Sequence, residues 1–183
     1  MRPLYTELDG VETFGQVGAI ERRLARLAAG VEHDPQQLEL MVLFHGVVGR
    51  LGSLAGGGRW QLFVRGLGLA DSDVTRLRSA LRRYAESPRT PEEKLLHDAV
   101  LLERTGVRAA VSRLLAAGRR RVPLERALAQ IDAGPDPGRF CTAAGREIAA
   151  ARQSVAVDWI ARLRDSLAEE ATAEESPAEG TEP

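Results

Sequence analysis

The spacing of apolar residues is the feature that most restricts how this chain can fold. Between its glycine and proline breaks, apolar side chains recur every three or four residues, as in Val17, Ile20, Leu24 and Leu27. That spacing places them on one face of an α-helix, whereas a half-buried strand would alternate apolar and polar residues. No alternating strand pattern is visible in the sequence. The sequence therefore predicts an all-α protein.

Composition supports the same fold class. Apolar residues make up 44% of the 183 residues, but aromatic residues only 4%, so the core must consist mainly of Leu, Ala and Val. Leu and Ala are among the best helix formers, and a chain of this length can bury one core. We expect one helical domain at residues 1–168, built from about seven or eight helices. Residues 169–183 are acidic and lack an apolar stripe, which predicts a disordered tail.

Capping residues and breaks indicate where the helices begin and end. Asp34 and Pro35 predict the start of a buried helix, and Asp71 or Ser72 caps another. The run Thr90–Glu93 is a capping box, whose helix should end at Gly106. Thr142 should cap the last long helix, with an inward stripe formed by Ile148, Val155, Trp159, Leu163 and Leu167.

Charge and cysteine content restrict the partners and the compartment. The formal net charge is −1, which gives no reason to expect a nucleic-acid or membrane partner. The basic run Arg119–Arg121 lacks interleaved aromatic residues and is interpreted as a solvated cluster. One cysteine, Cys141, excludes an internal disulfide, and no leader or spanning apolar run is visible. We expect a cytoplasmic, bacterial protein in which Cys141 is a small, buried or half-buried apolar side chain.

Three stretches resemble one protein family when their order and spacing are considered together. They are DPQQLELMVLFHGVVG at 34–49, TPEEKLLHDAVLLERTG at 90–106 and GRFCTAAGREIAAAR at 138–152. Together they are similar to the small HD-domain phosphohydrolases, and the resemblance covers residues 11–167. It implies an HD-domain-like helical bundle. In that family, a bound divalent metal polarises a phosphoryl oxygen and activates a water molecule.

The resemblance also implies where the metal ligands should lie, and two of the four are replaced. The ligand positions fall on Gln16, His45, Gly46 and Asp98. Glycine has no donor atom, and a glutamine amide is a weak, neutral ligand. His97 should not replace them, because neighbours on a helix point about 100° apart. We therefore expect no cofactor, and a divalent metal only if ligands not identified here complete a site.

Other residues could still form a pocket. His45 could act as a general acid or base oriented by Asp98, or the two could form an inherited structural hydrogen bond. Arg152 could pair with Asp98 or Glu103, or bind an anionic ligand bidentately. The residues expected to line the pocket are Gln16, Trp60, Tyr84 and Arg152.

Three functions agree with these residues. The leading hypothesis is a degenerate HD-domain protein that has lost metal-dependent phosphohydrolase activity and binds a small molecule or a protein partner, with a homodimer among the options. The second is a metal-independent enzyme with a repurposed pocket. The third is a residual phosphohydrolase acting on phosphomonoesters or nucleotides.

Overall fold

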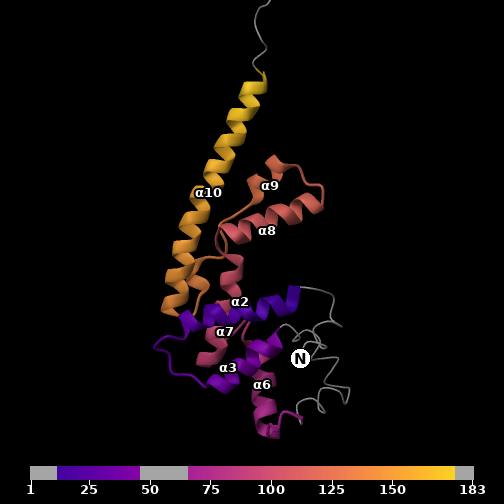
Figure 1. Ribbon diagram of the computed structural model, residues 1–183. Coiled ribbons are helices and arrows are strands. Elements are labelled where there is room, and N and C mark those ends of the chain that lie inside the picture. The colour runs from indigo at the N-terminus through magenta and orange to yellow at the C-terminus, as the bar shows by residue number, and fades with distance from the viewer. Residues whose placement is uncertain (1–11, 46–65, 176–183) are drawn as a thin grey trace, which may run out of the picture. The chain divides into compact units, whose positions relative to one another are not determined.

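The computed structural model describes residues 12–45 and 66–175, with side chains described for residues 17–45 and 66–170 (Figure 1). Within these ranges the chain forms seven α-helices and two short 3-10 helices, and it contains no strand. The prediction of an all-α protein with about seven helices is confirmed. None of the described helices is long and apolar enough to cross a membrane.

The chain forms two compact units. The first contains the described residues up to Leu102 together with Gly138–Arg146, and the second contains Glu103–Pro137 and the described residues from Glu147 onward. The last helix begins in the first unit and continues in the second. One helical domain at residues 1–168 stays a prediction.

The first unit is organised around helix α7 (Pro91–Leu101). Three other helices pack against it: α2 (Glu12–Leu27), α3 (Pro35–Phe44) and α6 (Asp71–Arg83). Each helix contributes apolar side chains to a common core, as its apolar spacing predicts. The largest of these side chains with almost no exposure are Ile20, Leu27, Met41, Phe44, Leu77, Leu81, Leu95, Leu96, Leu102 and Phe140.

Helix α3 begins where the sequence predicts. Asp34 caps it by accepting hydrogen bonds from the backbone N–H groups of Gln36 and Gln37, and Pro35 occupies the first turn. The backbone N–H of Asp34 donates to the buried carboxylate of Glu92 at 2.8 Å. The start of α3 is therefore held directly by α7. Helix α6 differs from the prediction, because its N-cap is Ala70 and Asp71 is its first residue.

Helix α7 begins at the predicted capping residue, but Glu93 has a different role from the one expected. Thr90 accepts a hydrogen bond from the backbone N–H of Glu93 at 3.3 Å. The Glu93 carboxylate is fully buried, and it accepts hydrogen bonds from the backbone N–H of Arg89 at 2.7 Å and from Arg83 Nη2 at 2.5 Å. Glu93 therefore links the end of α6 to the start of α7, and the hydrogen bond raises the pKa of the Arg83 guanidinium.

The second unit contains α8, Gly106–Arg119, α9, Leu124–Gln130, and most of α10, Ala143–Glu175. Its core consists of buried Ala110, Leu128, Ile131 and Ile160, with partly buried Leu114, Trp159, Leu163 and Leu167 packed against them. The predicted stripe of α10 was wrong at Val155, which is 60% exposed. The small residues Ala149 and Ala156 are buried instead, because they allow close packing against this face.

Two glycines permit the turns between these elements. The helix from Thr90 does not end at Gly106. It ends at Leu101, the 3-10 helix Leu102–Arg104 follows, and α8 begins at Gly106 with a φ of +82°. Gly134 has a φ of +122°, and a side chain there would lie 2.7 Å from the Arg104 carbonyl oxygen. Both conformations favour glycine over residues with a Cβ.

Helix α10 also continues further than expected. It remains helical to Glu175, past residue 169, where the sequence predicted the acidic tail to begin. Ala and Glu dominate this last part of the helix, and both have high helix propensity, so helix can continue without an apolar stripe. Residues 176–183 lie outside the described ranges.

The buried position of Glu93 yields a first prediction. The Glu93→Ala variant removes a fully buried acceptor, leaving the Arg89 N–H without its acceptor and the Arg83 guanidinium without its anion. We expect a loss of about 3 kcal/mol in the free energy of unfolding, measured by urea denaturation followed by circular dichroism. The matched control is Arg76→Ala, which breaks an exposed ion pair with Asp73 and should cost less than ~1 kcal/mol. Equal losses in the two variants would contradict the prediction.

Candidate functional site

Asp98 is the polar centre of the first unit. It lies in α7 with no exposed surface. Its Oδ1 accepts a hydrogen bond from the backbone N–H of Cys141 at 2.8 Å, and its Oδ2 accepts one from the backbone N–H of Thr142 at 2.8 Å and one from Thr142 Oγ1 at 2.6 Å. A buried carboxylate needs such donors to offset the loss of water. Asp98 therefore anchors the segment that leads into α10.

Thr142 extends this network into the first turn of α10. Its Oγ1 accepts a hydrogen bond from the backbone N–H of Gly145 at 2.9 Å, which confirms Thr142 as the cap of the last helix. Gly145 is buried, and a Cβ added there would lie 2.9 Å from both Asp98 Cγ and Thr142 Oγ1 and closer still to Asp98 Oδ2. The absence of a side chain at Gly145 is what allows the carboxylate to reach the helix end.

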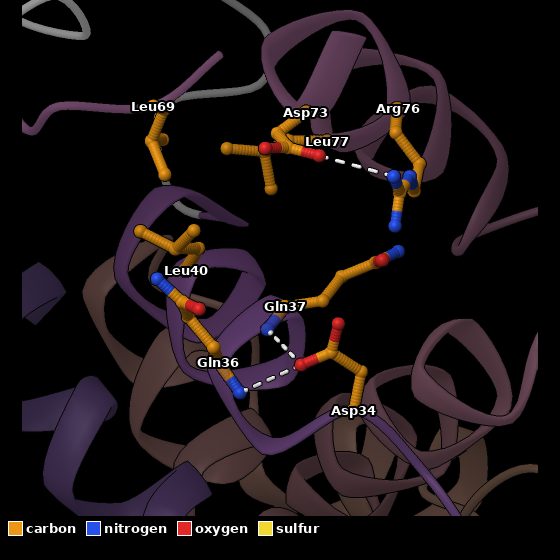
Figure 2. Close-up of a pocket in the computed structure, with 8 residues that line it drawn as sticks. All are labelled: Asp34, Gln36, Gln37, Leu40, Leu69, Asp73, Arg76 and Leu77. Atoms are coloured by element: carbon orange, nitrogen blue, oxygen red, sulfur yellow. Dashed lines mark hydrogen bonds and ion pairs between the residues drawn. The ribbon is translucent and has the colours of Figure 1, made fainter.

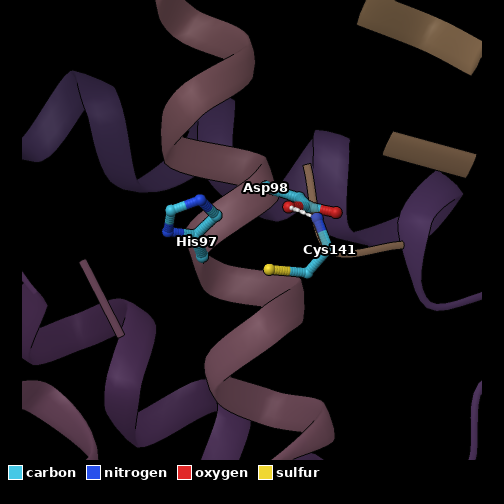
Figure 3. Close-up of side chains that lie close together, drawn as sticks. All are labelled: His97, Asp98 and Cys141. Carbon is cyan, nitrogen blue, oxygen red and sulfur yellow. Dashed lines mark hydrogen bonds between the residues drawn. The ribbon is translucent and has the colours of Figure 1, made fainter. Parts of the chain in front are cut away.

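His97 and Cys141 lie beside Asp98. Figure 3 shows His97 and Asp98 on successive positions of α7, with the Cys141 thiol facing the same region. A ring nitrogen of His97, a carboxylate oxygen of Asp98 and the sulfur of Cys141 all lie within 4.8 Å of one another. His97 and Asp98 are neighbours on α7, and Cys141 comes from a separate segment and lies near both.

The contacts of the His97 ring are with the backbone. Its Nδ1 donates a hydrogen bond to the carbonyl oxygen of Tyr84 at 2.9 Å, and its Nε2 lies 3.3 Å from the carbonyl oxygen of Arg139. The ring is therefore oriented by the end of α6 and by the 3-10 helix Pro137–Arg139. Sequence spacing could not predict these two contacts of the His97 ring, because the partners are main-chain groups 13 and 42 residues away.

The surroundings of Cys141 raise the pKa of its thiol. Partial burial raises the pKa of the thiol, and the negative charge of Asp98 raises it further, while Lys94 and Arg146 partly offset both effects. A thiol is a weak nucleophile until it ionises. The arrangement does not activate Cys141 for attack, and Cys141 is half-buried.

His45 is the residue that the sequence predicts as a general acid or base beside Asp98. It is the C-cap of α3 and is half-buried, and its Nδ1 donates a hydrogen bond to the carbonyl oxygen of Val42 at 2.7 Å. The described hydrogen bonds of Asp98 come from Cys141 and Thr142. The Val42 carbonyl oxygen contributes to the orientation of the His45 ring.

The other residues proposed from the sequence are only partly described. Gly46 and Trp60 lie outside the described residues, and so does the side chain of Gln16, whose backbone belongs to α2. Tyr84, which the sequence predicts as a pocket residue, is buried at the C-cap of α6. Arg152 is half-buried in the second unit, the unit that also contains Glu103, and its Cβ would contact a side chain added at Gly106.

The described part of the first unit also contains two hollows. A small pocket of about 100 Å³ lies between the start of α3 and α6, with the carboxylate of Asp34, the amides of Gln36 and Gln37 and the Asp73–Arg76 ion pair on its walls (Figure 2). A larger, open groove of about 280 Å³ lies between α2 and α3. Its walls are mostly apolar, with Glu21 and Glu39 beside Leu24, Ala25, Ala28, His33, Pro35, Leu38 and Val42.

Comparisons with known proteins identify the fold and nothing finer. No family model matches the chain, and no curated protein matches it. Among solved structures, the crystal structure of the Lin1889 protein from Listeria innocua is similar, with a TM-score of 0.64 and 15% sequence identity. The match covers 84% of this chain and 86% of the Listeria protein. At this identity, the likeness shows a shared fold alone.

Gly145 provides a test of the Asp98 anchor. In the Gly145→Ala variant, the new methyl group would displace the Asp98 carboxylate from Thr142. We expect a loss of about 2–3 kcal/mol in the free energy of unfolding, measured by urea denaturation.

The control is Gly118→Ala in α8, where a Cβ would meet no other atom within 4 Å. Because alanine favours helix over glycine, that variant should be unchanged or up to ~1 kcal/mol more stable. A Gly145→Ala protein as stable as the Gly118→Ala protein would show that the close approach to Asp98 is not needed.

Proposed function

We propose that this chain is a degenerate HD-domain protein that lacks metal-dependent phosphohydrolase activity and acts as a binding module. The proposal rests on the contacts of the Asp98 carboxylate. In the family that the sequence resembles, this position would bind the catalytic metal, but here it accepts three hydrogen bonds from Cys141 and Thr142. The carboxylate is therefore engaged with the segment before α10, and the ligand set that the resemblance implies offers only His45 as a second strong ligand beside it.

The remaining ligand positions support the same proposal. A tight hydrolytic site needs several imidazole or carboxylate ligands, and the resemblance puts an amide at Gln16 and no side chain at Gly46. His45 has one ring nitrogen engaged with Val42. These residues do not fit the metal that the family would use, so we derive no hydrolytic step through it.

The groove between α2 and α3 supports a binding role. Its volume of about 280 Å³ approaches the roughly 300 Å³ at which ligand pockets begin, and most of its walls are apolar. Glu21 and Glu39 are exposed and also line the groove. A small, mainly apolar molecule bearing a positive group matches this chemistry. A cytoplasmic setting in a bacterium is part of the proposal, since the chain contains a single cysteine and is rich in Arg, Ala and Gly.

Hydrolysis assays test the loss of activity. The purified full-length chain is incubated with p-nitrophenyl phosphate and with nucleoside mono- and triphosphates, in the presence of Mg²⁺, Mn²⁺, Co²⁺, Ni²⁺ or Zn²⁺. We expect turnover no higher than that of the His45→Ala variant, because too few strong ligands remain to hold a catalytic metal. His33→Ala is the matched control, since His33 lies in a loop and donates to the Val31 carbonyl oxygen. Metal-dependent turnover that His45→Ala abolishes and His33→Ala retains would overturn the proposal.

An uncharged hydrophobic fluorophore, Nile red, tests the groove. We expect its emission to rise and shift to the blue with the wild-type chain, because the apolar walls exclude water from the dye. The Ala25→Glu variant puts a carboxylate into the groove and should weaken dye binding by at least ~10-fold, since burying a charge against an apolar ligand is costly.

The matched control for this experiment is Ala29→Glu, at an exposed position that does not line the groove. It should bind the dye as the wild-type chain does. Equal binding by the two variants would show that the dye binds elsewhere, and the groove would then not be the binding site.

A further inference from the structure

His97, Asp98 and Cys141 together have the composition of a transition-metal site. They offer one nitrogen, one oxygen and one sulfur atom, all within 4.8 Å of one another (Figure 3). Zinc accepts all three atom types, at distances of about 2.0–2.3 Å. Ligand atoms grouped this closely need only small side-chain rotations to surround one ion. Only Asp98 is shared with the ligand positions that the HD resemblance implies.

The His97 ring is oriented as a metal ligand usually is. Its Nδ1–H donates to the Tyr84 carbonyl oxygen at 2.9 Å, and a ligating histidine typically donates its second N–H to a carbonyl or carboxylate. With Nδ1 engaged by Tyr84, Nε2 is the nitrogen left to bind an ion, and it lies 3.3 Å from the Arg139 carbonyl oxygen.

The Asp98 carboxylate keeps the capacity to bind an ion. Its two oxygens accept three hydrogen bonds, and only one of these is on Oδ1. An ionised carboxylate has about four lone-pair sites, so Oδ1 can still bind a cation. The hydrogen bonds from Cys141 and Thr142 fix its direction, as second-shell contacts do for ligating carboxylates. Cys141 is half-buried, so solvent can reach the thiol side of the cluster.

We propose that His97, Asp98 and Cys141 bind one zinc ion, with water as the fourth ligand. The thiol gives up its proton to solvent on binding, because the thiolate is the ligand. The mixture of imidazole and thiolate favours zinc over magnesium or calcium, which prefer oxygen ligands. The ion links α7 to the segment that enters α10, in addition to the hydrogen bonds of Asp98. This inference does not depend on the proposed loss of hydrolysis.

Cobalt(II) is the probe for this site, because a cobalt–thiolate bond gives an intense near-ultraviolet charge-transfer band. The metal-free, full-length chain is titrated with Co²⁺ and then with Zn²⁺. We expect one Co²⁺ per chain with this band, and its loss when one equivalent of Zn²⁺ is added. The chain has one cysteine, so the band reports Cys141 alone. No band in the wild-type chain would overturn the proposal.

Substitutions of His97 and Cys141 test these two zinc ligands, and substitutions of the other two histidines exclude zinc binding elsewhere. We expect His97→Ala to weaken zinc binding by at least ~10-fold and Cys141→Ser by about 100-fold. His33→Ala and His45→Ala should keep the band and the affinity. A His97→Ala chain that binds as tightly as the wild type, or loss of the band in His45→Ala, would overturn the proposed ligand set.

A measurement on the wild-type chain removes any dependence on variants that fold poorly. Zinc should slow the alkylation of Cys141 by iodoacetamide by at least ~10-fold, because a coordinated thiolate is shielded. Unchanged alkylation at saturating zinc would overturn the site. Hydrolysis that depends on His45 would overturn the proposed function alone, whereas a missing cobalt band would overturn the zinc site alone.

Discussion

The structure depends most on one buried carboxylate. Asp98 lies inside the first unit and accepts hydrogen bonds from two backbone N–H groups and one hydroxyl at the entrance to α10. A charge buried in this way is tolerated only when donors surround it, so the position of the segment around Cys141 and Thr142 is set by the carboxylate. Gly145 is part of the same constraint, since a side chain there would occupy the space of the carboxylate.

Helix α7 carries two more buried carboxylates that accept hydrogen bonds from backbone N–H groups. Glu92 accepts a hydrogen bond from the N–H of Asp34 at the start of α3, and Glu93 accepts one from the N–H of Arg89 just before α7 itself. Together with Asp98, these residues are three buried carboxylates on one central helix. Each satisfies backbone N–H groups near a helix start, which would otherwise lack partners. The helix that forms the apolar core of the first unit therefore also connects its neighbours through polar contacts.

The hydrogen bonds of Asp98 affect metal binding as well as stability. Hydrogen bonds that hold a helix end also orient the carboxylate toward His97 and Cys141, so an anchoring network and a candidate zinc site share one residue. The site would differ from a hydrolytic one in its ligands, with a thiolate from the segment before α10 in place of side chains from α2 and α3. The groove between α2 and α3 is formed by other residues of the same unit, so ligand binding there would not require Asp98.

The sequence by itself determined the all-α fold, most helix starts and the core face of α2, because apolar spacing and capping act within a few residues of the chain. It also identified Thr142 as a cap and Asp98 as a central polar residue. Only the tertiary structure decided which groups contact Asp98, that Cys141 joins His97, and that α10 buries Ala156 rather than Val155. Those contacts connect residues some 40 positions apart, and no local spacing rule specifies them.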